Sequence, residues 1–486
     1  MVGPHRDPGG VPKGGGSPLT ALDALFNPAS VAVVGASRDP TKPGGLILRY
    51  LLDSTARVYP VHPSVSEIHG VRCFPSVRAL PEPVDLAVIA TPVDATLRVL
   101  QECVWRGVRV AILVAGGFGE TGEEGRRREE EVVRIARMGG MRLLGPNTLG
   151  VLVPRSGVDT LFIVREKAPR PGPGPIAFIS QSGAIAVTRM TAAAWEGIGF
   201  HSFVGLGNRA DIQENELLAY LATQPAVGSA ALYLESFADG AGFLDLAREV
   251  SGRLPVCLVK AGRSPGGARA ASLHTGSLAG SDRVVGGVLR QAGVYRAYDD
   301  EELIDVAWAL ACAPLPRGDR VAVVVSAGGH GVMLADFLEA KEHAVGLRLA
   351  NLSEATQERL RREILPFASV ANPIDLTASA TIPMYERVLS IIEEEPGVDA
   401  VLCSVQVEPP GLDERLVDVL TAYARSTTKP VVAASVGGEA SLQVRRALNR
   451  AGVPAYPSLW RAARALGALV ERARRLHPER FGARAP

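Results

Sequence analysis

Short aliphatic and β-branched runs alternate with longer amphipathic stretches along the first third of the chain. Residues 95–106 and 123–138 place apolar side chains at helical spacing and leave a polar face, which predicts helices. The aliphatic runs between turn residues predict buried parallel strands at residues 31–34, 57–61, 85–90, 108–114 and 141–144. This alternation predicts an α/β fold, with an open parallel sheet covered by helices on both faces.

The same alternation returns twice after a proline-rich stretch, APRPGPGP at residues 168–175, which predicts a linker. The expected strands are at residues 176–179, 230–234 and 255–260 in the second unit and at 321–325, 400–403 and 430–434 in the third. VGSAALYLESFADG, from Val227, and VDAVLCSVQVEPPG, from Val398, follow the same strand, loop and helix pattern. We interpret the two units as internal copies, with Glu235 opposite Gln406, although two ordinary α/β units would show a similar pattern.

The chain therefore divides into three α/β domains and their connecting segments. A length of 486 residues suits about three domains of about 150 residues each. We expect a disordered Gly- and Pro-rich arm at 1–18, a Rossmann-like domain at 19–150, a linker at 151–175, a second α/β domain at 176–312, a third at 318–470 and a tail at 471–486.

The composition excludes several classes of function. The formal net charge is +1 and aromatic residues make up 5%, so neither a basic nucleic-acid surface nor a base-stacking platform is expected. The apolar runs are shorter than the ~20 residues of a membrane span, and the N-terminal arm lacks an apolar signal core. Five dispersed cysteines without a CxxC pair predict neither disulfides nor a metal site. We expect a cytoplasmic protein that binds no membrane and no nucleic acid.

The turn after the first strand has the features of an anion site. In VAVVGASRDPTKPGG, Gly35 permits a tight turn, and the following helix start offers free amides and a positive dipole end. The GxGxxG motif is incomplete, and the second strand ends in YPVHP without the acid that holds a nicotinamide ribose. Arg38 and Lys42 add positive charge, which suits a ligand with an extra phosphate, such as CoA. Alternatively, Gly35 and Ser37 only shape the turn and Lys42 is a solvated surface residue.

A second candidate site lies in the second unit, where ASLHTGSLAGSD places His274 among glycine and hydroxyl residues. A neutral histidine attacks phosphorus when a carboxylate orients its other nitrogen, and Glu235 and Asp282 are the nearby candidates. ISQSGA, at residues 179–184, is a strand end that opens a helix, and KAGR, at 260–263, ends another strand. The carboxyl ends of several strands thus converge on one site. The alternative is a hydrogen-bonded structural histidine.

These motifs resemble a known family along most of the chain. SVAVVGASRDPTKPGG, VYPVHP, DLAVIATP and GPNTLG resemble the CoA-binding domain of the ADP-forming acetate–CoA ligases. FISQSGA, GLGNRAD, YLES, VKAGRS and SLHTGSLAGSD resemble their succinyl-CoA-ligase-like flavodoxin domain, and SAGGHGV and VANPIDLT a second such domain. The chain is thus similar to the CoA-binding, phosphohistidine-carrying alpha subunit of these nucleoside-diphosphate-forming acyl-CoA synthetases, in the succinyl-CoA synthetase superfamily. The resemblance implies a Rossmann-like CoA-binding domain followed by two flavodoxin-like domains.

The resemblance also implies a reaction and the residues that perform it. Acyl-CoA, phosphate and ADP interconvert with a carboxylic acid, CoA and ATP through an acyl phosphate and a phosphohistidine. The phosphorylated histidine corresponds to His274 and its orienting carboxylate to Glu235. The implied CoA contacts are Gly35, Ser37, Lys42, Pro63, Pro92 and, near the thiol, Asn147. The implied phosphate contacts are Ser180, Ser182 and Gly183.

The sequence departs from the family pattern in two ways. His62 stands where the family usually has asparagine, Ser64 where a basic residue is common, and His330 where a Gly-Pro-Gly motif has proline. In addition, no remaining segment is long enough for the ATP-grasp domain that holds ADP and Mg²⁺. We therefore expect a hetero-oligomer in which a separate ATP-grasp beta-type subunit binds Mg²⁺ and ADP/ATP. The alternatives are a non-catalytic CoA or acyl-CoA sensor and, disfavoured by the missing acid, a nicotinamide oxidoreductase.

Overall fold

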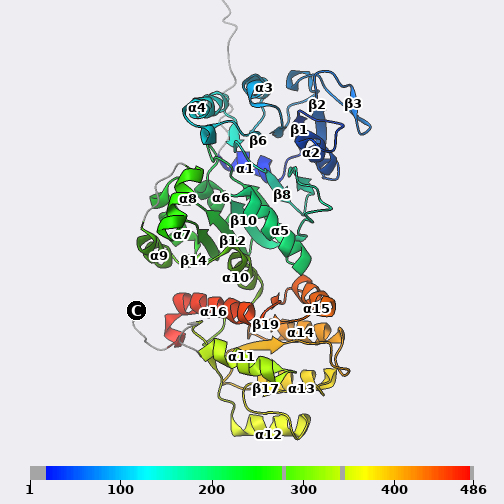
Figure 1. The fold of residues 1–486 in the computed structure, drawn as a ribbon, viewed down its shortest axis with the longest axis vertical. Helices are drawn as coiled ribbons and strands as arrows, with labels where there is room; N and C mark the ends of the chain where they lie inside the picture. The colour runs from blue at the N-terminus through cyan, green and yellow to red at the C-terminus, as the bar shows by residue number, and fades with distance from the viewer. Residues whose placement is uncertain (1–17, 276–280, 340–344, 482–486) are drawn as a thin grey trace, which may run out of the picture. The chain divides into compact units, whose positions relative to one another are not determined.

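The computed structural model describes residues 18–275, 281–339 and 345–481, with the backbone only at 18–20 and 272–275. The chain forms two compact units (Figure 1). Unit 1 contains residues 1–152, 156–162 and 206–213, and unit 2 contains residues 153–155, 163–205 and 214–486. The predicted arm at 1–18 lies outside the described residues except for Pro18, which begins α1 (Pro18–Phe26).

Unit 1 is built on a five-stranded parallel sheet of order β2-β1-β5-β6-β7. Its strands are β1 (Ser30–Val34), β2 (Arg57–Val61), β5 (Leu86–Ile89), β6 (Val110–Leu113) and β7 (Arg142–Leu144). All five predicted strands are confirmed. They are continuous aliphatic runs because helices cover both faces of a parallel sheet. α3 (Val93–Arg106) and α4 (Glu123–Met138) bury Leu100 and Val132 against it, and α2 (Pro43–Leu51) contacts β1.

Two pairs of short strands lie outside this five-stranded sheet. β3 (Glu67–Ile68) and β4 (Val71–Arg72) form an antiparallel hairpin. β8 (Val151–Val153) pairs with β9 (Val158–Asp159), within the stretch that the sequence analysis treats as a linker.

Residues 206–213 belong to unit 1 by their contacts, although the sequence analysis placed their GLGNRAD motif in the second domain. The side chain of Asp211 is 1% exposed and accepts hydrogen bonds from Arg142 Nε at 2.9 Å and from the Leu143 backbone N at 2.8 Å. It also pairs with Arg137 at 2.9 Å. The motif is a polar run without periodicity, so its packing partners could not be inferred from the pattern.

The first half of unit 2 contains a parallel sheet with the strand order β14-β13-β12-β10-β11. The strands are β10 (Pro173–Ser180), β11 (Phe200–Gly205), β12 (Ser229–Leu234), β13 (Val256–Lys260) and β14 (Tyr295–Arg296). The helices are α5 (Gly183–Glu196), α6 (Glu214–Leu221), α7 (Gly240–Val250), α8 (Pro265–Thr275), α9 (Asp282–Gln291) and α10 (Asp300–Cys312). The three predicted strands are confirmed. The prediction that 168–175 holds no regular structure is wrong for its last residues, because β10 begins at Pro173 with a register shift that accommodates the prolines.

The second half of unit 2 has a parallel sheet of order β16-β15-β18-β19-β20, with β17 beside β15. The strands are β15 (Arg320–Val325), β16 (Arg348–Leu349), β17 (Ile374–Asp375), β18 (Ala400–Ser404), β19 (Val431–Ala434) and β20 (Ala455–Tyr456). The helices are α11 (Gly328–Glu339), α12 (Glu354–Glu363), α13 (Ile382–Glu393), α14 (Arg415–Ser426), α15 (Glu439–Arg450) and α16 (Leu459–Leu476). The predicted boundary at residue 470 falls inside α16, where buried Val470 and Ala473 continue the apolar face.

Both halves of unit 2 have the flavodoxin strand order. With the two-residue strand β17 left aside, their sheets run second, first, third, fourth and fifth strand in chain order, as β11-β10-β12-β13-β14 and β16-β15-β18-β19-β20. The shared order supports the interpretation of the two halves as internal copies. In sheets of this order ligands generally bind beyond the carboxyl ends of the strands, where the strand order reverses.

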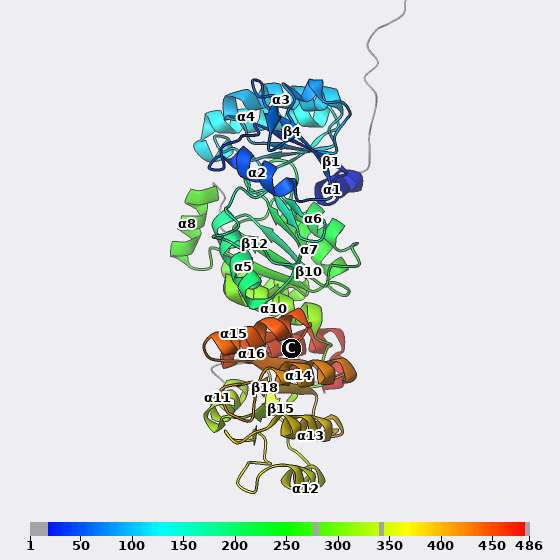
Figure 2. The ribbon, with the colours of Figure 1, turned by 90° about the vertical axis from the view of Figure 1, so that its right-hand side faces the viewer.

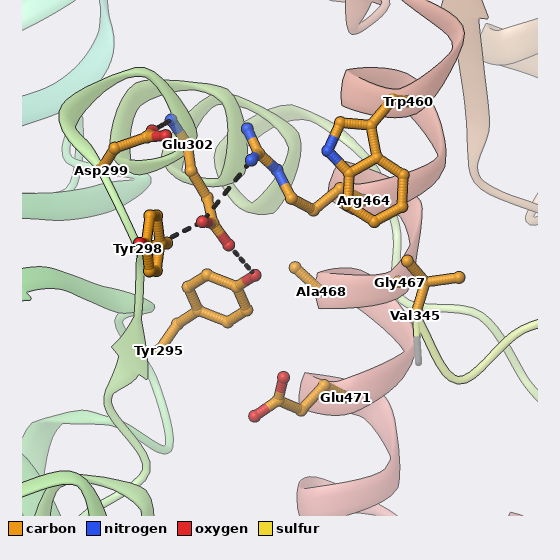
Figure 3. A pocket seen from close by; sticks show the side chains of 10 residues that line it. All are labelled: Tyr295, Tyr298, Asp299, Glu302, Val345, Trp460, Arg464, Gly467, Ala468 and Glu471. Atoms are coloured by element: carbon orange, nitrogen blue, oxygen red, sulfur yellow. Dashed lines mark hydrogen bonds and ion pairs between the residues drawn. The ribbon is translucent and has the colours of Figure 1, made fainter. Parts of the chain in front are cut away.

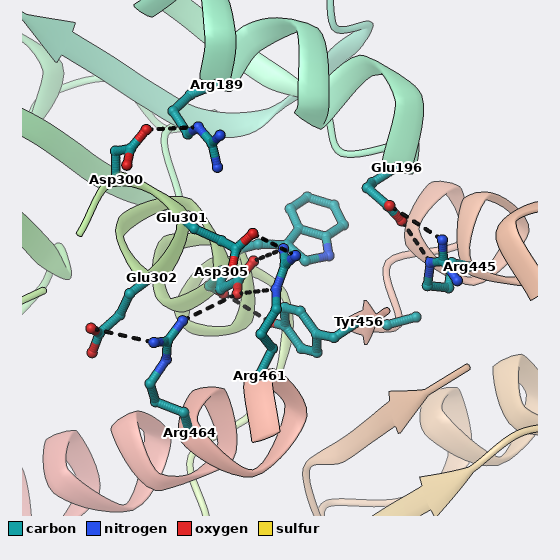
Figure 4. Close-up of polar contacts among 12 residues, drawn as sticks. Arg189, Glu196, Asp300, Glu301, Glu302, Asp305, Arg445, Tyr456, Arg461 and Arg464 are labelled. Carbon is teal, nitrogen blue, oxygen red and sulfur yellow. Dashed lines mark hydrogen bonds and ion pairs between the residues drawn. The ribbon is translucent and has the colours of Figure 1, made fainter. Parts of the chain in front are cut away.

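Helices α10 and α16 pack together where the two halves of unit 2 meet (Figure 2). Buried polar side chains join them there (Figure 4). Asp305, on α10, is 1% exposed and accepts two hydrogen bonds from Arg461, both 2.7 Å long. Arg464 lies 3.5 Å from the same carboxylate, and Arg461 also pairs with Glu301 at 2.9 Å. The hydroxyl of Tyr456 donates to the backbone O of Asp305 at 2.8 Å. A buried carboxylate with two arginines therefore lies in the contact.

A second group of contacts fixes the C-terminal end of α5. Arg445, on α15, pairs with Glu196 at 2.8 Å (Figure 4). Asn449 Nδ2 donates to the backbone O of Glu196 at 2.8 Å, while its Oδ1 accepts from Trp308 Nε1 at 2.8 Å. These contacts explain why the two sheets form one compact unit.

Candidate functional site

The turn after β1 brings three chain segments into close contact in unit 1. Gly35 has a φ of +86°, and a Cβ atom there would lie 2.6 Å from Ala90 O. Its backbone N donates to Val61 O at 3.1 Å. A Cβ atom on Gly44, in the first turn of α2, would lie 2.0 Å from Gly35 O. Only glycine fits both positions, so the start of α2 approaches the end of β1 as a phosphate-binding turn requires.

The side chains in this turn have different roles. Ser37 Oγ accepts a hydrogen bond from Asp39 N at 3.0 Å, so this hydroxyl shapes the turn. Hydrogen bonds from Thr41 lower the pKa of Asp39, and the charge of Lys42 contributes. Lys42 is exposed directly before Pro43, the first residue of α2. Arg38 donates to Glu67 O at 2.7 Å, so it holds the β3–β4 hairpin rather than pointing freely to solvent.

The structure places the predicted CoA contacts at one edge of the sheet. Pro63 follows β2 by two residues, Pro92 caps α3 after β5, and Asn147 follows β7. Because the strands are parallel, their carboxyl ends share one edge with the Gly35 turn after β1. Asn147 has a φ of +58°, and its backbone N donates to Ala115 O at 3.0 Å.

The predicted phosphate contacts lie in unit 2 where β10 leads into α5. Ser180 is buried, and its Oγ donates to Ser182 O at 2.8 Å and accepts from Ser182 N at 3.1 Å. Ser182 caps α5, and its Oγ accepts from Ile185 N at 3.4 Å. Gly183 is the first residue of α5. Ser180 therefore shapes the turn, while the first backbone amides of α5 offer the anion-binding groups.

Glu235 follows β12, the strand beside β10, and its backbone is held on two sides. Its N donates to Gln181 Oε1 at 2.6 Å, and its O accepts from Lys260 Nζ at 2.6 Å. Gln181 N in turn donates to Tyr233 O at 3.0 Å. Burial lowers the pKa of Lys260, and the charge of Arg296 adds to this effect. Gln181 and Lys260 lie within the quoted motifs, yet the sequence analysis assigned them no role.

His274 lies in α8, but its side chain and residues 276–280 are outside the described part of the structure. The contact expected between His274 and Glu235 therefore stays a prediction. Asp282, the other candidate to orient the imidazole, is the first residue of α9 and forms an ion pair with Arg296. Glu235 follows the carboxyl end of β12 and stays the predicted orienting carboxylate.

A cavity of about 460 Å³ lies between α10 and α16, away from these residues (Figure 3). Its walls include Tyr295, Tyr298, Glu302, Arg464 and Glu471. The Glu302 carboxylate accepts from Tyr295 OH at 2.7 Å and from Tyr298 N at 2.8 Å, so it is occupied by the protein. None of the residues predicted for CoA, phosphate or the phosphohistidine lines this cavity.

Two further kinds of site are absent from the described residues. In those ranges no three histidine, cysteine, aspartate or glutamate side chains gather as a metal site. None of the helices that the structure describes is both long and apolar enough to span a membrane.

Three family models match consecutive parts of the chain. Residues 29–154 match a CoA binding domain, residues 173–310 a succinyl-CoA ligase like flavodoxin domain and residues 321–477 a ligase-CoA domain. The three matches coincide with the three parallel sheets in chain order, so the chain belongs to the class of CoA ligases built from these domains.

The relatives identify the family within this class. The chain is 39% identical to the acetate–CoA ligase [ADP-forming] II subunit alpha of Pyrococcus furiosus, over 93% of this chain and 98% of that subunit. It is 36% identical to a dinucleotide-forming acetyl-coenzyme A synthetase 1 of Ca. Korarchaeum cryptofilum, solved with phosphate and ADP. That match has a TM-score of 0.84 and covers 94% of this chain and 97% of that one. The chain belongs to the alpha subunits of the ADP-forming acetate–CoA ligases.

Proposed function

We propose that this chain is the CoA-binding, phosphohistidine-carrying subunit of a nucleoside-diphosphate-forming acyl-CoA synthetase. The observation that carries the proposal is the 39% identity along nearly the whole length of an alpha subunit. The relatives are ligases, so the alternative of a non-catalytic CoA sensor is not favoured. In this proposal the domain at residues 19–150 binds CoA, and the domain at residues 176–312 carries out phosphoryl transfer.

The reaction proceeds in three steps. A phosphate oxygen attacks the thioester carbonyl carbon and the C–S bond breaks. The CoA thiolate departs, and an acyl phosphate is formed. The imidazole of His274 then attacks phosphorus, and the carboxylate leaves as the free acid. ADP finally takes the phosphoryl group and frees the imidazole. Glu235 accepts a hydrogen bond from the second ring nitrogen, which leaves the attacking nitrogen unprotonated.

The turn geometry supports the assignment of the anionic substrates. The Gly35 turn and the start of α2 hold a CoA phosphate on backbone amides, with Lys42 beside it and Pro63 and Pro92 along the same edge. The start of α5, capped by Ser182 with Gly183 first, receives inorganic phosphate or the phosphohistidine. In both places the groups that bind the anion are preformed by the fold.

A second chain completes the enzyme. A single-chain relative, the acetate–CoA ligase [ADP-forming] I of Archaeoglobus fulgidus, is 35% identical over 92% of this chain, which spans only 63% of that relative. We propose that an ATP-grasp subunit supplies the remaining part, binds ADP and holds Mg²⁺, which would neutralise the nucleotide phosphates. All five cysteines are free thiols, which fits the reducing cytoplasm.

CoA should bind to the full-length chain without any partner, because all the proposed contacts lie on unit 1. In calorimetric titrations, Lys42→Ala should weaken CoA binding about threefold to tenfold at low salt and less at high salt, because salt screens an exposed phosphate contact. Arg57→Ala is the matched control, since Arg57 is also exposed but lies at the opposite end of β2. NAD binding as tight as CoA binding would contradict the assignment of this site.

The purified chain alone should not make ATP from acetyl-CoA, phosphate and ADP. The three matched domains lie between residues 29 and 477, and none of them is the ATP-grasp fold that binds a nucleoside triphosphate. Adding a matching ATP-grasp subunit should restore turnover, measured by coupled ATP luminescence. The same mixture with His274→Ala is the control and should stay inactive. Robust ATP synthesis by the single chain would show that the division between two subunits is wrong.

A further inference from the structure

Asn208, in the segment 206–213, has an amide nitrogen that faces two carboxylates. Its Nδ2 donates to Glu120 Oε2 at 2.5 Å and to Glu129 Oε2 at 2.8 Å. An ionised carboxylate only accepts hydrogen bonds, so the nitrogen of the amide has to face these two side chains and its oxygen has to face away. The orientation of the Asn208 amide is therefore determined by charge.

The oxygen of that amide faces Asn147, one of the predicted CoA contacts. Asn147 Nδ2 donates to Asn208 Oδ1 at 3.3 Å. Asn147 Oδ1 lies near Gly116, where a Cβ atom would be 3.3 Å away from it. Among the described residues Asn147 Nδ2 donates to Asn208, which engages one of its two hydrogens and leaves the second for a ligand. The two carboxylates fix the direction of the Asn147 amide through Asn208.

The carboxylates themselves are held by backbone amides. Glu120 Oε1 accepts from Gly117 N at 2.5 Å, and Glu129 Oε2 accepts from Gly119 N at 3.1 Å. Burial opposes the charged form of Glu120, but hydrogen bonds from Asn208 and Gly117 outweigh it and lower its pKa. Glu120 therefore stays an acceptor at neutral pH.

The backbone around Asn208 is packed too closely to permit another arrangement. Asn208 N donates to Pro146 O at 2.9 Å. A Cβ atom on Gly207 would lie 2.2 Å from Pro146 O and 2.6 Å from Asn147 O. Asp211, buried among Arg142 and its neighbours, anchors the other end of the segment. The two asparagines are thus held side by side by the main chain before their amides interact.

We propose that Glu120, Glu129 and Asn208 are positioning residues that turn the Asn147 amide so that its second Nδ2 hydrogen faces the acyl thioester. The proposal rests on the proposed function, in which Asn147 lies near the thiol of CoA. A fixed N–H donor near the thioester carbonyl stabilises the negative charge that develops on its oxygen when phosphate attacks. The carboxylates act only through Asn208 and touch no substrate.

The test inverts the donors and acceptors of the cluster. Asn208→Asp puts a third carboxylate against Glu120 and Glu129, so the side chains move apart and Asn147 loses its support. In the complex with the ATP-grasp subunit, kcat for CoA release from acetyl-CoA, phosphate and ADP should fall about 100-fold, the effect of losing one oxyanion donor. KM for acetyl-CoA should stay within about twofold of the wild-type value, because the contacts that bind acetyl-CoA before the reaction are unchanged.

The triple variant Glu120→Gln, Glu129→Gln, Asn208→Asp should recover most of the lost rate. The amide at position 120 then donates to the carboxylate introduced at position 208 and keeps its oxygen on Gly117 N. The amide at position 129 also donates to it, in place of the Oε2 atom that accepts from Gly119 N. The introduced carboxylate still accepts from Asn147 Nδ2, so the direction of Asn147 is restored. Asn147→Ala should slow the reaction about as much as Asn208→Asp, and combining the two should add no further loss. Glu123→Gln is the control, since Glu123 is exposed on the same helix as Glu129 and pairs only with Arg127 among the described residues.

The possible outcomes separate this proposal from the proposed function. A triple variant that folds and binds CoA but stays as slow as Asn208→Asp would show that the carboxylates act directly, and would overturn the positioning role. Losses that multiply in the Asn147→Ala, Asn208→Asp double variant would overturn it as well. Failure of the wild-type complex to release CoA in a phosphate-dependent reaction would instead overturn the proposed function.

Discussion

Replacing His274 by alanine is expected to abolish phosphoryl transfer in the complete complex. With acyl-CoA and labelled phosphate but without ADP, the wild-type complex should accumulate an acid-labile, base-stable label on His274. The variant should carry no label and should lose at least about 10³-fold in turnover, because the group that accepts the phosphoryl is gone. The label and its position are measured by phosphopeptide mapping under alkaline conditions.

Glu235→Gln is the matched variant for the orienting carboxylate. It should slow phosphorylation and leave CoA binding intact, because the proposed CoA contacts belong to unit 1 and Glu235 to unit 2. The hydrogen bonds from Glu235 N to Gln181 and from Lys260 to Glu235 O involve only the backbone at this position, so the substitution keeps them. If His274 merely filled a turn, His274→Ala would cost about 1 kcal/mol of stability and keep its activity. A label mapped to another histidine would refute the assignment.

Replacing Asp305 by alanine should destabilise unit 2 by about 3–5 kcal/mol, as expected when one partner of a buried ion pair is removed. The substitution leaves Arg461, which makes two hydrogen bonds of 2.7 Å to Asp305, without its main acceptor. It also removes a carboxylate 3.5 Å from Arg464. Guanidinium unfolding, followed by circular dichroism, measures the loss.

Glu394→Ala is the control for this prediction. Glu394 pairs with Arg359 at 2.6 Å, a bond of nearly the same length, but both side chains are largely exposed. Solvent screens such a pair, so its removal should leave the unfolding transition unchanged. Equal effects of the two substitutions would show that the α10–α16 contact contributes no more than a surface pair.

The sequence pattern predicted the sheets better than their accessory segments. Strands such as β1 and β12 are continuous aliphatic runs, and burial on both faces preserves that signal. β11, FHSFVG, was missed because His201 and Ser202 interrupt its apolar run, although the strand lies next to β10. The two-residue strands, such as β14, are too short to show any period.

The location of the candidate site could be predicted from the sequence, but the side-chain contacts within it could not. Positions that follow strands, such as Gly35 and Glu235, were placed correctly at the carboxyl edges of their sheets, because strand ends are visible in the pattern. Ser180 stays a predicted phosphate contact, and the structure adds that its side chain bonds to Ser182 within its own turn, which the pattern did not indicate. The role of Asn208 depends on contacts with residues about 60 to 90 positions away, which no local pattern encodes.

The contacts between α5, α10, α15 and α16 also determine which movements unit 2 can make. Opening the contact would break the ion pairs of Asp305 and Arg445, which are 1% and 6% exposed, and would bring both side chains into water. Rotation of one flavodoxin-like half against the other would have to break these ion pairs first, so the contact opposes a hinge between the two sheets.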